Sequence, residues 1–298
     1  MLNPLYTLDV EDISQATACD SQHTTQQLES GHILYAPKLN FELTESEQSL
    51  LHPDICDTKK KNISYQYQKQ QLGGVSTYHP QQAEIQAMMH RYALFAKMWV
   101  DALLPDYNTA LRWGRTSYRP AEVSGRQRSK RQDDTRLHVD AFPATPVQGW
   151  RILRVFCNIN PDNKPRVWHS GEPFADLLNR FAPRLAPYHA LNAKVLHWLK
   201  ATKVLRSAYD HYMLQLHDRM KLDDAYQASV EKSKIEFPAN STWMVFTDHV
   251  SHAALSGQYL LEQTFYLPVT AMLDQAHSPL RQIEKTLLQV EESAAISA

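Results

Sequence analysis

His138 and Asp140 are separated by one valine and stand just before the apolar run GWRILRVFCNI. On an extended strand, residues two positions apart project to the same face. An imidazole and a carboxylate placed in this way, joined by one more histidine from elsewhere in the chain, make a facial triad of metal ligands. Such a triad leaves half of an octahedral iron open for chemistry, so the first hypothesis is a non-haem Fe(II) site.

The third ligand has two candidates, His249 and His252, which follow the strand-like segment STWMVF. We prefer His252, because we expect it to begin a short turn, AALSG, before the next strand, whereas His249 beside Asp248 fits a surface or ligand-orienting place. Two strand ends so far apart in sequence converge only in a closed or rolled sheet, such as a jelly roll. In the competing interpretation the histidines are structural, and Asp140 only fixes a tautomer.

A triad with open coordination sites needs an organic partner. The cosubstrate 2-oxoglutarate chelates iron at one end, while its far carboxylate seeks a cation, and arginine meets a carboxylate with a planar fork of donors. In the strand RILRVFCNIN, period-two alternation places Arg154, Phe156 and Asn158 on one face. We expect Arg154 to bind the carboxylate, with Arg166 as the second candidate, and we expect Asn158 to take part in binding the cosubstrate. The alternative for Arg154 is a salt bridge to a core acid.

Basic residues gather in the segment that leads into His138. Their members are Arg112, Arg115, Arg119, Arg126, Arg128, Lys130, Arg131 and Arg136. A basic run is most often a solvated face, but one that ends at a metal ligand suggests that an anionic substrate is led to the iron. We take Arg115, Arg119 and Arg136 as candidates for substrate contact. Nucleic acid is disfavoured, because few aromatic residues are interleaved with the basic ones.

Hydrophobic periodicity indicates the elements that position these residues. Apolar residues spaced by three and four predict a helix over Glu84 to Leu104. Strand patterns cover Trp150 to Asn160, Ser241 to Phe246 and Gln258 to Leu267. The fold class is therefore α+β with a mainly β, jelly-roll core. We expect one domain over 1–298: supporting strands and helices in 1–105, core in 106–174 and 236–270, a helical insertion in 175–235 and a C-terminal helix in 271–298.

Composition restricts the class of protein. The chain has 298 residues, 43% of them hydrophobic, which is enough for a substantial core. The net charge of -1 argues against a general nucleic-acid-binding surface, and no apolar run is long enough to span a membrane. The first residues lack the features of a signal peptide, and the three cysteines have no disulfide or metal spacing. The expected location is the cytoplasm.

Several ordered segments resemble one known family. The segments LRWGRTSYRP, RLHVDAFPATPVQGWRILRVFCNINP, RVWHSGEPF and WMVFTDHVSHAALSGQYLLEQTFYLP are similar to those of the Kdo 3-hydroxylases. The resemblance covers most of the chain. It implies a double-stranded β-helix (jelly roll) with flanking helices, and an iron triad of His138, Asp140 and His252.

The resemblance also implies a reaction. Enzymes of that family are Fe(II)/2-oxoglutarate dioxygenases that use O2, release succinate and CO2, and hydroxylate C3 of the Kdo sugar in lipopolysaccharide to give Ko. A Kdo-lipid A precursor carries a carboxylate and phosphates, which would suit the basic segment. It would be met at the cytoplasmic face of the inner membrane, and contact with the membrane would have to be peripheral because no span is present.

The sequence departs from the broader dioxygenase pattern after the last histidine. Many such enzymes place an arginine there for the far carboxylate of 2-oxoglutarate, but this chain has SGQYLLEQT. Either Gln258 or Gln263 contributes, or the cation comes from the opposite strand, where Arg154 lies. Two other functions stay open at this point: a non-catalytic jelly-roll module that binds an anionic saccharide or lipid, and a zinc hydrolase with the same ligands.

Overall fold

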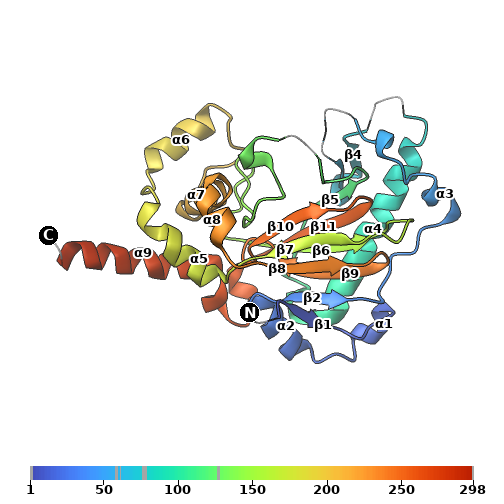
Figure 1. The fold of residues 1–298 in the computed structure, drawn as a ribbon, viewed down its shortest axis with the longest axis horizontal. Helices are drawn as coiled ribbons and strands as arrows, with labels where there is room; N and C mark the ends of the chain where they lie inside the picture. Colours follow the sequence, from blue (N-terminus) through green and yellow to red (C-terminus); the bar gives the residue numbers. More distant parts are fainter. Residues whose placement is uncertain (1–2, 58–59, 61, 76–78, 126–127, 297–298) are drawn as a thin grey trace.

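A computed structural model describes residues 3–57, 60, 62–75, 79–125 and 128–296, and its centre is a pair of β-sheets that pack face to face (Figure 1). The described strands of the large sheet run in the order β1-β2-β9-β6-β11-β5-β3-β4, and those of the small sheet in the order β10-β7-β8. Neighbours in the sequence are mostly not neighbours in the sheets, as a rolled sheet requires. The predicted α+β class with a double-stranded β-helix core is confirmed.

The strands of the large sheet are β1 (Leu5–Thr7), β2 (Ile33–Ala36), β3 (Ile63–Gln66), β4 (Gln71–Gly73), β5 (Arg112–Arg119), β6 (Arg151–Asn158), β9 (Ser241–Phe246) and β11 (Leu260–Leu267). Those of the small sheet are β7 (Arg166–Ser170), β8 (Ser233–Phe237) and β10 (His252–Ser256). The helices are α1 (Ile13–Ala16), α2 (Ser21–Glu29), α3 (Glu45–Gln48), α4 (Gln82–Leu103), α5 (Phe174–Phe181), α6 (Ala190–Trp198), α7 (Ala208–Leu222), α8 (Asp224–Ser229) and α9 (Pro279–Ile296). None of the described helices is long and apolar enough to cross a membrane.

Helix α4 covers the outer face of the large sheet, where its apolar stripe is buried (Figure 1). Tyr92 ties the helix to the sheet, because its hydroxyl donates to the carbonyl of Val155 on β6 at 3.0 Å. The helix predicted from the spacing of apolar residues is confirmed. By holding β6 from outside, α4 fixes the strand whose inner face carries Arg154.

Aromatic residues fill the space between the two sheets. Phe156 of β6 stacks on Trp243 of β9 with ring centroids 5.3 Å apart, and Trp168 of β7 meets both of them edge to face. Phe237 of β8 stacks on Trp243 at 3.9 Å. This packing places β7 opposite β6, so that the inner faces of the two strands line a common interior.

The helices α5 to α8 form an insertion between β7 and β8. Their buried face includes Leu177, Met213 and Leu216, and it packs around Leu137 and Val139. These two residues flank His138 in the sequence. The insertion therefore packs against the segment that carries His138 and Asp140.

Three local expectations are wrong. His138 does not lie on a regular strand but forms an isolated bridge with His252. The expected turn after His252 is β10, whose small residues Ala253 and Ala254 pair with β7. Strand β8 begins at Ser233, inside the segment expected to be helical. It was missed because its alternation of exposed and buried residues is short and follows directly on helices.

Candidate functional site

His138 and His252 face each other across an isolated antiparallel bridge. The His138 amide donates to the His252 carbonyl at 3.0 Å, and the His252 amide donates to the His138 carbonyl at 2.9 Å. The centroids of the two imidazole rings lie 4.6 Å apart. The backbone thus brings together two histidines that are more than a hundred residues apart in the sequence.

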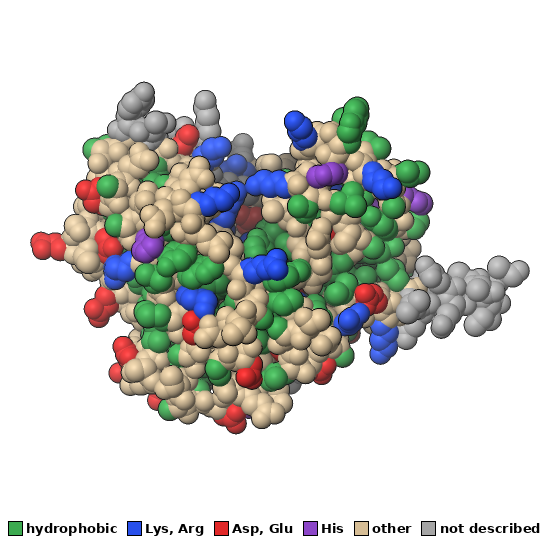
Figure 2. All heavy atoms as spheres, turned by 180° about the vertical axis from the view of Figure 1, so that it is seen from behind, with side chains coloured by type: hydrophobic (Ala, Val, Ile, Leu, Met, Phe, Trp, Pro, Cys, Tyr) green, Lys and Arg blue, Asp and Glu red, His purple; other side chains and the backbone are tan. Residues whose placement is uncertain are grey.

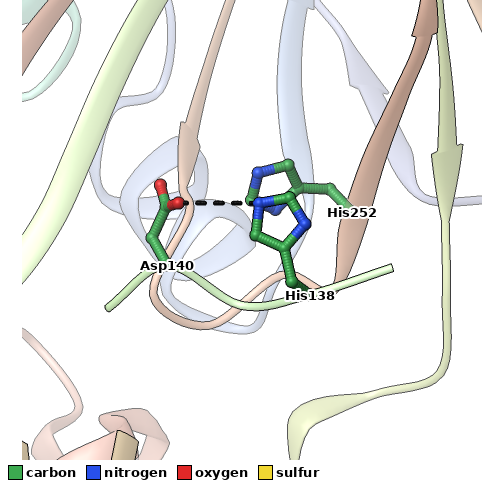
Figure 3. Close-up of side chains that lie close together, drawn as sticks. All are labelled: His138, Asp140 and His252. Atoms are coloured by element: carbon green, nitrogen blue, oxygen red, sulfur yellow. Dashed lines mark ion pairs between the residues drawn. The ribbon is translucent and has the colours of Figure 1, made fainter. Parts of the chain in front are cut away.

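Both imidazoles make the same local hydrogen bond through Nδ1. His138 Nδ1 lies 2.8 Å from the Arg136 carbonyl, and His252 Nδ1 lies 2.8 Å from the Val250 carbonyl. A carbonyl only accepts, so Nδ1 carries the hydrogen and Nε2 keeps its lone pair. Asp140 Oδ1 lies 3.8 Å from His138 Nε2 (Figure 3). One ligand atom from each of His138, Asp140 and His252 lies within 4.8 Å of the others, which is the donor set of a facial triad.

The charges of the three side chains suit a divalent cation. Burial lowers the pKa of His138 and of His252, so both imidazoles are neutral at pH 7. Burial alone would raise the pKa of Asp140, but the charge of Arg154 outweighs it and holds that pKa below its ordinary value. The Oδ2 atom of Asp140 is buried and accepts no hydrogen bond of good geometry, although Arg154 Nη2 lies 3.3 Å away. A buried carboxylate oxygen without a well-aligned donor is costly, and a metal ion would stabilise it.

The loop between β9 and β10 fixes the backbone around the triad. The Thr247 carbonyl accepts a hydrogen bond from the Asp140 amide at 2.8 Å. Asp248, the next residue, accepts from Arg151 Nε at 2.7 Å and from the Ile152 amide at 3.2 Å. The loop that presents His252 is therefore anchored to the start of β6.

Arg154 lies between two buried carboxylates on the inner face of the large sheet. Its Nη2 is 3.3 Å from Asp140 Oδ2, and its Nη1 is 3.4 Å from Glu262 Oε1. Glu262 also accepts from Arg119 Nη2 at 2.7 Å. Burial would raise the pKa of Glu262, but the two arginines outweigh it and lower that pKa. Arg154 faces inward as predicted, and it forms the salt bridges to core acids that were the alternative interpretation.

Arg166, on β7, is a buried cation whose charge is favoured by the nearby carboxylates of Glu122 and Asp134. Its Nη1 donates to the Gly257 carbonyl at 2.8 Å, while its Nε has no partner. Burial lowers the pKa of this guanidinium, but arginine stays protonated at neutral pH. Two residues further along β7, Trp168 stacks on His252 with centroids 5.1 Å apart. Arg166 is therefore a buried cation on the same face of β7 as Trp168, which contacts His252.

A cavity of about 560 Å³ adjoins the buried charges. Its lining includes Arg119, Arg154 and Glu262, together with the exposed Arg115 and Lys203. Figure 2 shows Lys and Arg side chains around a hollow near the top of the molecule. The volume suits a small organic ligand, and the basic lining suits an anionic one. The structure thus brings Arg115, Arg119 and Arg154 to one cavity.

Other predicted residues have different surroundings. Arg136 lies at the junction of α7 and α8, where its Nη2 donates to Asp224 at 2.6 Å, and it is not among the described residues that line the cavity. Asn158 donates to two backbone carbonyls at 3.0 Å, so its amide has a structural role. Gln258 is half-buried in the turn between β10 and β11. Arg126 of the basic segment lies outside the described residues.

His249 points away from the triad. Its Nε2 lies 3.3 Å from the amide nitrogen of Gln282 on α9, and its ring packs 5.5 Å from that of Phe174 on α5. It lines a separate groove of about 980 Å³. The structure brings His252, and not His249, to His138 and Asp140.

Three residues of the site escaped the sequence analysis. Glu262 is a lone acid within the apolar strand LLEQTFYL, a signal that could have identified it. Trp168 lies two positions from Arg166 and therefore on the same face of β7. His217 comes from α7, and its ring meets that of His138 edge to face with centroids 5.5 Å apart. No local sequence pattern places a residue of the insertion beside the triad.

Comparisons with known proteins agree with this geometry. A family model described as 3-deoxy-D-manno-oct-2-ulosonic acid (Kdo) hydroxylase matches residues 12–290. The solved structure of the Kdo hydroxylase KdoO with cobalt(II), a non-heme Fe(II) alphaketoglutarate-dependent dioxygenase, is 44% identical in sequence. The alignment covers 96% of each chain with a TM-score of 0.91. KdoO structures with alphaketoglutarate and Fe(III), and with succinate and Fe(III), have a TM-score of 0.90. No match is found among the curated proteins.

Proposed function

The chain belongs to the Kdo hydroxylase family and is a non-haem Fe(II), 2-oxoglutarate-dependent dioxygenase, and we propose that His138, Asp140 and His252 bind its iron. The observation that carries this assignment is the paired hydrogen bonding of the two Nδ1 atoms, which leaves both Nε2 atoms free beside a buried carboxylate. Iron bound by these residues supplies the oxidising chemistry that consumes 2-oxoglutarate and O2. The two hydrogen-bonded imidazoles enter the site already oriented.

We assign the far carboxylate of 2-oxoglutarate to Arg166. Its buried guanidinium donates through Nη1 to the Gly257 carbonyl, while its Nε has no hydrogen-bond partner and is available to an anionic ligand. Arg154, our first candidate from the sequence, already contacts Asp140 and Glu262. Its proposed role is to orient Asp140 and to contact the metal end of the cosubstrate.

The proposed substrate is the Kdo sugar of a lipid A precursor, hydroxylated at C3 to give Ko with release of succinate and CO2. The basic cavity lining supports this choice, because Kdo carries a carboxylate, and Arg115 and Arg119 lie where that group could be bound. The proposed location is the cytoplasm, with peripheral contact at the inner membrane.

The test is turnover of a Kdo-lipid A precursor in detergent with Fe(II), 2-oxoglutarate and O2. We expect one succinate for each Kdo that gains one oxygen, as detected by mass spectrometry. Kdo that stays unmodified while 2-oxoglutarate is consumed would reject the proposed substrate. Consumption that proceeds without O2 would reject the dioxygenase reaction.

The ligand assignment has its own test, independent of substrate. Anaerobic addition of Fe(II) and 2-oxoglutarate should produce a visible charge-transfer band. We expect His138→Ala to remove this band, and Arg136→Ala, a change in a residue engaged with Asp224, to retain it. A band that persists in His138→Ala would contradict the triad.

A further inference from the structure

Helix α6 exposes a row of large apolar side chains. Leu191, Val195 and Trp198 are 75%, 52% and 80% exposed, and Leu199 is 60% exposed. The spacing of four and then three residues places the first three on one face of the helix. Ala193 is buried on the opposite side, so the outward direction of this row is fixed by packing.

Tryptophan is rarely left in water, and Trp198 is exceptional within this chain. All six tryptophans are described, and the other five are buried or half-buried. An exposed tryptophan next to an exposed leucine indicates a surface that binds a partner or a membrane. Tryptophan also has the amphipathic ring that favours the boundary between lipid and water.

The part of the chain that contains α6 has basic residues and no acidic ones. Between Asp176 and Asp210 the sequence contains no acidic residue, and its six cations are Arg180, Arg184, Lys194, Lys200, Lys203 and Arg206. Lys194 lies one turn from both Leu191 and Trp198, on the apolar face itself. Lys194 and Lys200 are exposed and form no ion pair with a described residue. Apolar and unpaired cationic side chains therefore occupy one surface.

This surface adjoins the mouth of the active-site cavity. The Lys203 amide donates to the Ala144 carbonyl at 3.0 Å, and both residues line the cavity of about 560 Å³. In Figure 1, α6 stands at the outer end of the insertion, on the side where the cavity-lining loop before β6 lies. Any partner that binds α6 would therefore lie close to the mouth of this cavity.

We propose that α6, with Leu199 and Lys200, docks the enzyme on an anionic phospholipid surface. The apolar face enters the interfacial region while the lysines meet the headgroup phosphates, which is the pattern of an interfacial helix. A second copy of the chain is a poorer occupant, because a symmetric contact would place the unpaired lysines of both copies against each other. The inference rests on the proposed function in one respect: a lipid-linked sugar gives such docking its purpose.

The first experiment measures co-sedimentation of the full-length enzyme with vesicles. We expect binding to phosphatidylcholine vesicles that contain phosphatidylglycerol, and little binding to phosphatidylcholine alone. The double variants Leu191→Ser/Trp198→Ser and Lys194→Glu/Lys200→Glu should each lower binding by about tenfold or more. Met98→Ser is the matched control, because Met98 is 53% exposed on α4, and it should bind as the wild type does.

The second experiment uses Trp198 as a probe. Its emission should shift to the blue when anionic vesicles are added, and the shift should vanish in Trp198→Phe, a variant that retains an aromatic ring and should still bind. Unchanged vesicle binding in both double variants would overturn the proposal. A dimer of the wild type that dissociates in Leu191→Ser/Trp198→Ser would also overturn it, in favour of self-association.

Hydroxylation of a detergent-solubilised Kdo substrate separates this inference from the proposed function. We expect the α6 variants to keep wild-type turnover in detergent. Turnover in detergent without vesicle binding would refute docking and leave the proposed function intact. Vesicle binding that depends on α6, without hydroxylation of Kdo, would support docking and refute the proposed substrate.

Discussion

Asp248 and Arg151 form an ion pair of 2.7 Å in which both side chains are fully buried. The pair joins the loop before β10 to the first residue of β6, on the outer side of the large sheet. Because the neighbouring Thr247 carbonyl binds the Asp140 amide, the pair holds a loop that contacts the triad directly. The geometry of the metal site thus depends on two residues that do not touch it.

Replacement of Asp248 by alanine should destabilise the fold and weaken metal binding together. The variant leaves the Arg151 guanidinium buried without its partner, which costs about 3–5 kcal/mol. Urea denaturation measures the stability, and titration of the anaerobic charge-transfer band with Fe(II) measures the affinity. A destabilised variant with wild-type Fe(II) affinity would show that the loop does not position the ligands.

The two late histidines should differ sharply when replaced by alanine. His252→Ala removes a proposed ligand and should lower turnover by more than about a hundredfold with loss of the Fe(II) band. His249→Ala changes a side chain that contacts Gln282 and Phe174 on the far side of the loop and should retain the band. Loss of the band in His249→Ala, with its retention in His252→Ala, would make His249 the third ligand.

Arg166→Ala should raise the KM for 2-oxoglutarate by about tenfold to a hundredfold, equivalent to about 1.4–2.8 kcal/mol of lost charge-assisted hydrogen bonding. The KM for the sugar substrate should change much less. Initial rates of succinate release at varied 2-oxoglutarate give the comparison. If Arg154→Ala alone raises this KM, the far carboxylate belongs to Arg154 instead.

Removal of metal by a chelator should abolish turnover and leave the fold intact. The two ligand histidines are held by backbone hydrogen bonds and by Nδ1 contacts that do not require the ion. Circular dichroism should be unchanged, and Fe(II) should restore activity without a refolding step. Loss of tertiary structure on chelation would mean that the ion, and not the backbone, organises the site.

Glu262→Gln should change how stability depends on pH. Folding lowers the pKa of Glu262, so this carboxylate contributes stability that is fully present above its unfolded pKa of about 4.3. That contribution is lost as the pH falls through the lower folded pKa. The variant should therefore be less stable than the wild type at pH 7, by about 3 kcal/mol, with the difference shrinking on acidification. A constant difference in urea denaturation across this range would show that Glu262 does not supply it.

Local patterns predicted the elements that are long or strictly periodic. The stripe of α4 and the alternation of β6 are properties of neighbouring residues, and both were correctly predicted. His138, Asp140 and His252 could be grouped because two histidine-bearing segments flank strong strands. Strand β10 was missed because its small residues, Ala253 and Ala254, acquire strand geometry from pairing with β7.

Contacts between distant segments could not be predicted in the same way. The charge of Arg154 is compensated by Glu262 from a neighbouring strand, and the ring beside His138 comes from His217 of the insertion. The alternation in β6 gives the direction of Arg154 but not the identity of its partner. The choice between Arg154 and Arg166 therefore required the packing of the two sheets.

The row of Asp140, Arg154, Glu262 and Arg119 has a thermodynamic consequence for the order of ligand binding. Two carboxylates and two guanidiniums already neutralise one another in this row. A divalent ion bound beside Asp140 introduces two positive charges into a region shielded from water, and 2-oxoglutarate carries two negative ones. Each of the two ligands should thus increase the affinity of the other, so that metal and cosubstrate load cooperatively while either alone binds weakly.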